Sequence, residues 1–176
     1  MSNQVKYPGL KSLLIYVGLY SVVLIFCIPV YAQINPEKPP KPIFVKVSTL
    51  QHLNFGTIIP NGASGGTVTV DHNGSRSYIG QIILPATGSY CSPALFEVTA
   101  LPGTLITIVN GSGTSLSGSN TGSVSLTLGP ASTGSPFIAR STVTDVFIGG
   151  TLTVQSLSAN PAGFYSGTFT VTFIQN

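Results

Sequence analysis

The side chains that could act in catalysis or bind a metal are few and far apart along the chain. His52 and His72, together with Asp71 and Cys91, are the residue types that bind transition metals, but no pair has the spacing of zinc ligands. Each histidine also lies in or beside an expected turn, where a solvated imidazole is the ordinary role. The sequence therefore predicts no metal site and no cofactor.

The remaining groups give no better evidence for catalysis. Asp71, Glu97 and Asp145 lie in three different segments, and a glycosidase would need two such carboxylates to meet at one site. The serines lack the strand–turn–helix context of a hydrolase nucleophile, and the glycine-rich stretches precede expected strands rather than helices. We therefore expect that the protein is not an enzyme.

The charge pattern excludes a nucleic-acid partner. The whole chain has seven basic and four acidic residues, but Lys6 and Lys11 precede a long apolar run at the amino terminus. The other five basic residues nearly balance the acidic ones, and no basic patch with interleaved aromatics is present. The basic character of the full sequence comes largely from its first residues.

Residues 1–32 have the pattern of a secretory signal peptide. Lys6 and Lys11 come before the apolar run Leu13–Val30, and a small residue, Ala32, marks the expected cleavage site. The run is long enough that an uncleaved membrane anchor is the alternative. With cleavage, the protein is secreted, has no further membrane contact, and retains a single cysteine, Cys91. Cys91 is then a small buried hydrophobic residue or, alternatively, half of an intermolecular disulfide.

The next segment, residues 33–42, is expected to be an extended spacer. It has four prolines, which fix the backbone and lack an N–H donor. A strand follows at once, with Ile43, Val45 and Val47 on one face. Because this strand comes after a semi-rigid spacer, two arrangements are open. It folds back as an ordinary first strand, or it inserts into a neighbouring domain as a donor strand.

The clearest strand of the chain is the last one, from Gly163 to Ile174. Aromatic and β-branched residues alternate strictly over this length, which is the period of a half-buried strand. One face has the apolar and aromatic side chains, and the other has serine and threonine. The residues that we assign to a groove or an assembly surface on this strand are Gly163, Tyr165, Phe169, Val171 and Phe173.

Between these two strands the chain has many short strand patterns separated by turn signals. Asp71–Gly74 predicts a hairpin, Asn110–Gly122 is polar enough to predict a mobile loop, and Gly149-Gly150 predicts a bend or tight hairpin. No helical period appears after the leader. Residues 43–176 are therefore predicted to form one antiparallel β-sandwich or barrel.

Three internal motifs, taken in order with the last strand, suggest a family. They are Leu53–Ile59, Gly65–Asp71 and Ile148–Val154. Together they resemble a family of secreted bacterial β-proteins, formally a domain of unknown function, placed near the fimbrial (pilin) subunits of chaperone–usher pili. The resemblance covers residues 43–174.

This resemblance implies an immunoglobulin-like sandwich at the surface of a Gram-negative bacterium. In such subunits one strand is completed in trans, first by a periplasmic chaperone and then by the next subunit. Gly163 and the alternating Phe169, Val171 and Phe173 match the groove-lining strand of these proteins. Two features depart from the pattern, because Gln175 replaces a penultimate tyrosine and an intrachain disulfide is absent.

From these observations we expect a structural or adhesive cell-surface subunit, secreted through the periplasm and assembled by strand addition. The alternative is a stand-alone surface module that binds a glycan or a host protein.

Overall fold

The computed structural model describes residues 39–86 and 89–176, so the expected leader and residues 33–38 lie outside the described residues. Residues 40–176 form one compact unit, which is all-β with no helix in its described part, and hence with none that could span a membrane. This confirms the predicted fold class. The strands are β1 (Phe44–Val47), β2 (Ile59–Pro60), β3 (Gly66–Val70), β4 (Arg76–Gly80), β5 (Ile82–Ile83), β6 (Ala94–Thr99), β7 (Leu105–Asn110), β8 (Thr114–Gly118), β9 (Ser123–Ala131), β10 (Phe137–Ile138), β11 (Val143–Val154), β12 (Tyr165–Ser166) and β13 (Val171–Gln175).

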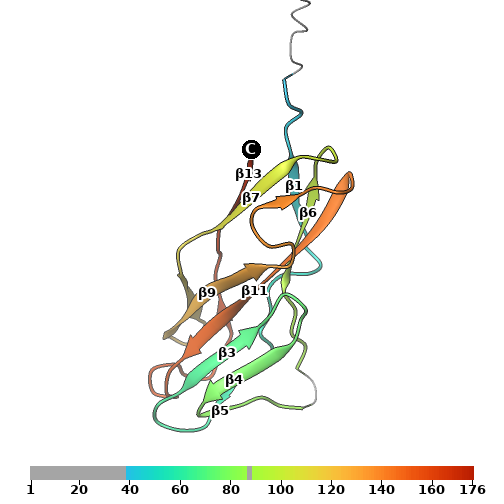
Figure 1. Ribbon diagram of the computed structural model, residues 1–176. Helices are drawn as coiled ribbons and strands as arrows, with labels where there is room; N and C mark the ends of the chain where they lie inside the picture. Colours follow the sequence, from blue (N-terminus) through green and yellow to red (C-terminus); the bar gives the residue numbers. More distant parts are fainter. Residues whose placement is uncertain (1–38, 87–88) are drawn as a thin grey trace, which may run out of the picture. The chain divides into compact units, whose positions relative to one another are not determined.

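The longest strand, β11, runs through the middle of the domain (Figure 1). One edge of β11 pairs first with β6 and then with β3, and its other edge pairs with β9. Val146 and Ile148 of β11 are fully buried. Every ladder between the strands is antiparallel. Strand β11 lies in the middle of the larger sheet and connects the β1–β6 side to the β9–β8–β12 side.

Gly149 and Gly150 lie inside β11, so the predicted bend or hairpin at this point is wrong. The register between β11 and β9 shifts between Ile148 and Gly150, which is a β-bulge rather than a turn. A Cβ atom at Gly149 would overlap the carbonyl oxygen of Val70. Glycine is needed here for close backbone approach within a continuous strand.

The polar stretch Asn110–Gly122 is also more ordered than its composition suggests. It contains β8, which pairs with β9 as a hairpin and with β12 on its other edge. The predicted mobile loop is therefore wrong over these five residues. Backbone pairing on both edges stabilises a strand whose side chains are mostly serine and threonine.

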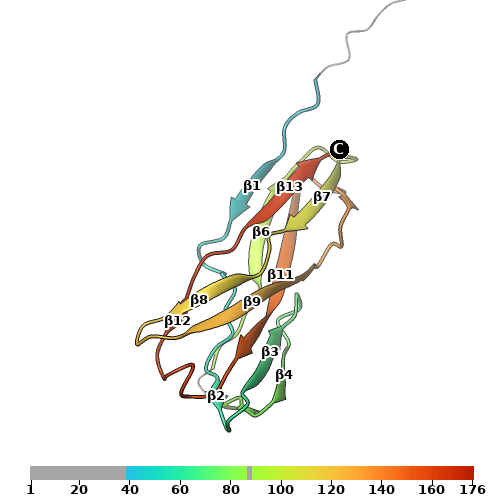
Figure 2. The same cartoon turned by 90° about the vertical axis from the view of Figure 1, so that its left-hand side faces the viewer.

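The final segment of the chain crosses from one sheet to the other. Its first part, β12, extends the eight-stranded sheet, and its last part, β13, pairs with β7 in a three-stranded sheet with β10. Figure 2 shows β13 beside β7 at the end of the domain where the chain terminates. The predicted hairpin at Asp71–Gly74 is confirmed, because the Asp71 carboxylate accepts backbone N–H bonds from Asn73 and Ser75.

The apolar core consists of two clusters along the domain. The first, here called the upper core, centres on β6, β7 and the first half of β11, and includes Ile106 and Ile148. The second, the lower core, centres on β3, β9 and the second half of β11, and includes Val68 and Leu126. Phe169 of the final segment packs against both clusters.

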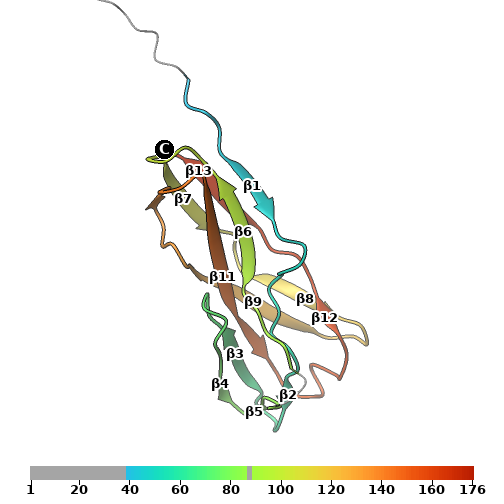
Figure 3. The same ribbon diagram turned by 90° about the vertical axis from the view of Figure 1, so that its right-hand side faces the viewer.

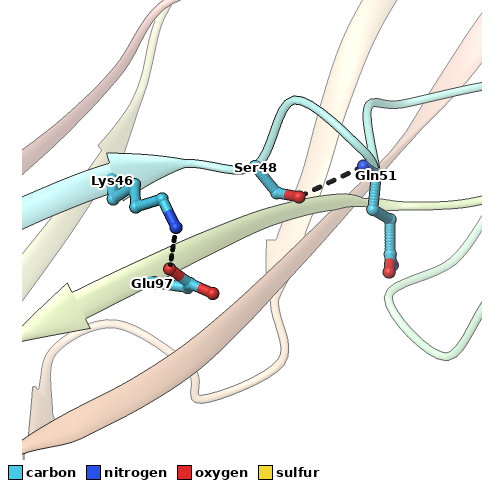
Figure 4. Close-up of polar contacts among 4 residues, drawn as sticks. All are labelled: Lys46, Ser48, Gln51 and Glu97. Carbon is cyan, nitrogen blue, oxygen red and sulfur yellow. Dashed lines mark hydrogen bonds and ion pairs between the residues drawn. The ribbon is translucent and has the colours of Figure 1, made fainter.

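Of the two arrangements open for residues 43–48, the structure shows the first. Strand β1 pairs with β6 of the same chain, and Ile43 and Val45 pack against the upper core (Figure 3). On the outer face, the Lys46 ammonium lies 3.0 Å from the Glu97 carboxylate of β6, and Ser48 Oγ accepts a bond from the Gln51 amide (Figure 4). The Lys46 side chain is well exposed and that of Glu97 is partly exposed, so the pair contributes little to stability.

The position of β1 predicts unequal effects for substitutions on its two faces. Val45→Asp should lower the free energy of unfolding by about 1.5–3 kcal/mol, because it removes apolar burial and introduces a charge at the upper core. Lys46→Ala, on the outer face, should lower it by less than about 1 kcal/mol. Urea unfolding of both variants measures the difference. Equal stabilities would show that β1 is not part of the domain.

Candidate functional site

In the described part of the chain, the final segment makes backbone hydrogen bonds along only one of its two edges, the edge that faces β8 and β7. The carbonyl of Thr170 accepts a bond from the residue after β7, and the amide of Asn176 donates to the carbonyl of Leu105, the first residue of β7. Because backbone groups of successive strand residues point to opposite edges, the even-numbered residues from 170 to 176 face β7. Val171, Phe173 and Gln175 therefore direct their N–H and C=O groups away from β7. No strand in the described part of the chain pairs with them there.

An open apolar groove of about 950 Å³ lies along the part of the final segment that precedes β13. One wall is the segment 52–60 that follows β1, and the other is the chain from residue 157 through Phe169. Its floor consists of side chains of the lower core, and residues of β8, β9 and β11 supply them. They are Leu116, Val124, Leu126, Leu152 and Val154. The groove therefore opens directly onto the core rather than onto a polar surface.

The rim of the groove carries large apolar side chains that are exposed to solvent. Phe164 is 88% exposed and Tyr90 is 70% exposed, and Ile59 and Leu157 also lie on the rim with about half of their surface free. Within residues 39–86 and 89–176, no aspartate, glutamate, lysine or arginine lines the groove. A groove of this kind favours an apolar occupant over a charged ligand.

The residues predicted on the final strand border this groove and the free edge. Gly163, Tyr165 and Phe169 line the groove, whereas Val171 and Phe173 pack against the upper core. The ring of Phe173 contacts that of Phe96 in β6, with centroids 5.5 Å apart. The structure thus places Gly163, Tyr165 and Phe169 at the groove, and Val171 and Phe173 at the upper core.

Gly167 of the same strand, which the sequence prediction did not single out, sets how closely the final segment approaches β8. A Cβ atom there would lie 2.8 Å from the Leu116 side chain and 3.2 Å from the carbonyl oxygen of Ser115. The tyrosine two residues earlier is held by its hydroxyl, which donates to the carbonyl of Pro161 at 2.7 Å. These contacts fix the wall of the groove without closing it.

The predicted donor residues Ile43, Val45 and Val47 lie on the opposite border of the upper core. Ser48 N donates to the backbone of β6, so Val45 and Val47 turn their backbone groups away from β6 by the same alternation. Strand β1 is thus a second edge without a partner on its outer side among the described strands. It lies at the same end of the domain as β13 (Figure 2).

Arg76 holds the wall formed by residues 54–57, a role that its sequence context did not indicate. Its guanidinium donates to the carbonyl of Phe55 at 2.9 Å and to Ser89 Oγ at 2.7 Å. The same Ser89 oxygen accepts a bond from the Thr57 amide at 2.8 Å. A cation in the hairpin strand β4 thereby ties two loops together beside the groove.

The titratable residues do not assemble into a reactive site in the described part of the chain. Pairing of β6 with β11 places Glu97 opposite Asp145, but both lie on the outer face of the sheet, away from the groove. His52 lies at the end of the groove and His72 lies in the hairpin. No group of three or more potential metal ligands occurs among the described residues. Cys91 is free and half-buried against the lower core, and its thiol donates to the carbonyl of Gly74.

Comparison with known proteins places the chain in a family without assigning a function. The family model described as "Domain of unknown function (DUF4402)" matches residues 45–174. The chain belongs to this family. No curated protein and no solved structure matches it. The matched range begins within β1 and ends within β13, so the family domain includes both unpaired edges.

The contacts of Arg76 predict that this residue stabilises the groove wall. Arg76→Ala should lower the free energy of unfolding by about 1.5–3 kcal/mol, the range for hydrogen bonds to a charged group. The exposed Arg140 provides a matched control, since Arg140→Ala should change stability by less than about 0.5 kcal/mol. Chemical denaturation of the two variants compares them. If Arg76→Ala lowers the free energy of unfolding no more than Arg140→Ala does, Arg76 does not stabilise the groove wall.

Proposed function

We propose that this protein is a secreted structural or adhesive cell-surface subunit, fimbria-like in its assembly, which receives an extended strand in its open groove. The observation that supports the proposal most is the free edge of the final segment next to an apolar groove. Val171, Phe173 and Gln175 offer unpaired backbone groups, and the groove offers a floor of core side chains.

An extended peptide satisfies both parts of this surface at once. Its backbone would pair with the free edge, and every second side chain would enter the groove. Unpaired edges of sheets recruit strands, and natural proteins usually protect them with charges or prolines. The final segment has neither along β13. The resemblance to pilin subunits supports the same mode of assembly, with a periplasmic chaperone as the first occupant and a neighbouring subunit as the next.

A second candidate function is a stand-alone module that binds a glycan or a host protein. The pairing of β1 with β6 of its own domain favours this function, because a chain that keeps its first strand needs no second copy to complete that edge. Exposed Tyr90 and Phe164 could then stack on sugar rings. Of the two candidates, the unpaired backbone edge favours strand addition, because glycan stacking does not require it.

A rim substitution tests strand addition without disturbing the core. The probe is a synthetic peptide that alternates valine with threonine over the length of residues 165–175, with a lysine at each end. Phe164→Asp should weaken its binding about tenfold, which corresponds to about 1.4 kcal/mol, and should leave the free energy of unfolding unchanged because Phe164 is almost fully exposed. Fluorescence titration measures the affinity.

The matched control is Ile79→Asp, which alters an equally exposed apolar side chain on β4, away from the groove. It should bind the peptide as the unmodified protein does. A version of the peptide that is N-methylated at every second residue lacks the donors for one edge, and it should bind at least tenfold more weakly. Equal binding of the methylated and unmethylated peptides would contradict strand addition.

A further inference from the structure

The structure bears on which polypeptide supplies the strand. Within this chain the segment suited to donation by its pattern is residues 43–47, with three apolar residues on one face. That segment is already hydrogen-bonded to β6 through four paired positions, and Ile43 and Val45 pack against the upper core. Its release would leave the edge of β6 unpaired and expose apolar side chains beneath it. Donation of β1 to a second copy would therefore uncover the β6 edge of its own domain while it filled the groove of the other.

The preceding residues are unsuited to the groove for a different reason. Residues 33–42 include Pro36, Pro39, Pro40 and Pro42, each of which lacks a backbone N–H. A strand inserted along β13 would pair with the outward backbone groups of Val171, Phe173 and Gln175. The four prolines occur at both odd and even positions, so either edge of an inserted segment would lack N–H donors.

We propose that this chain is an acceptor only, and that the strand in its groove comes from a different polypeptide rather than from a second copy. The inference rests on the proposed strand addition and specifies the partner. A chain that receives a strand but gives none ends an assembly. Such a subunit occurs once per assembly and does not form a homopolymer.

The groove also defines the chemistry of the partner's segment. Among the described residues the lining has no aspartate, glutamate, lysine or arginine, so the donor residues that point inward are apolar. Phe169, Val171 and Phe173 present an alternating face, and a donor with the same period of two matches it. The donor is therefore an extended segment of alternating apolar residues without proline in its paired stretch.

Two peptides separate this inference from the proposed function. Residues 33–176 are the test protein, because residues 40–176 form a compact unit on their own. The valine–threonine peptide described above represents a foreign donor, and a peptide of residues 33–47 represents a second copy. At saturation the foreign peptide should raise the Tm by about 5 °C or more, whereas the peptide of residues 33–47 should shift it by less than about 1 °C.

The self-association of the protein provides the second readout. Sedimentation across a hundredfold range of concentration should show a monomer throughout. If the peptide of residues 33–47 raises the Tm as much as the foreign peptide, or if the protein forms concentration-dependent oligomers that this peptide dissolves, the acceptor-only inference is wrong while strand addition stands. If neither peptide binds and the protein stays monomeric, the proposed function fails as well.

Discussion

Among the described residues, the final segment of this domain has backbone hydrogen-bonding partners along one edge only, and this constraint leaves its other edge open. Antiparallel pairing with β7 uses the backbone groups of alternate residues and leaves Val171, Phe173 and Gln175 directed outward. A strand at this position would normally be covered by another strand or blunted by charges. Strand β1, at the same end of the domain, is a second edge without a partner on its outer side among the described strands.

The domain is stable with one side open because strand pairing and core packing hold its other parts together. Strand β11 is paired along one edge by β6 and then β3, and along its other edge by β9 over its second half, and Val146 and Ile148 are fully buried within it. Phe169 contacts both core clusters and so links the final segment to the interior on its inner face. What stays incomplete is the lower core, whose side chains form the groove floor. An occupant would complete a core that the chain by itself leaves partly uncovered.

The sequence predicted the architecture better than it predicted local detail. Alternation in the final segment and the Asp71–Gly74 turn signal reflect local chemistry, and both predictions agree with the structure. Gly149-Gly150 was misjudged because glycines that allow close backbone approach inside a strand look in sequence like the glycines of a tight turn. Likewise β8 lies in a segment too polar for a strand by propensity, and it is held by tertiary pairing on both edges.

In the candidate site too, features set by local sequence were predicted, and features set by tertiary structure were not. Phe169, Val171 and Phe173 were found because their period of two is visible in the sequence. Arg76 was missed because its partners are backbone carbonyls and a serine in loops that only the fold brings near β4. The groove itself could not be predicted, because a missing strand neighbour is a property of topology. Pairing of β1 with β6 was one of two arrangements that the pattern allowed.

Amide hydrogen exchange, followed residue by residue in the protein without a partner, tests the central claim most directly. If the final segment is paired on one edge only, the amides of Thr172 and Ile174 should be strongly protected and those of Val171 and Phe173 should exchange rapidly. Addition of a groove-filling peptide should then protect the second pair. Uniform protection of all four amides in the free protein would show that the edge is already paired, and the account would be wrong.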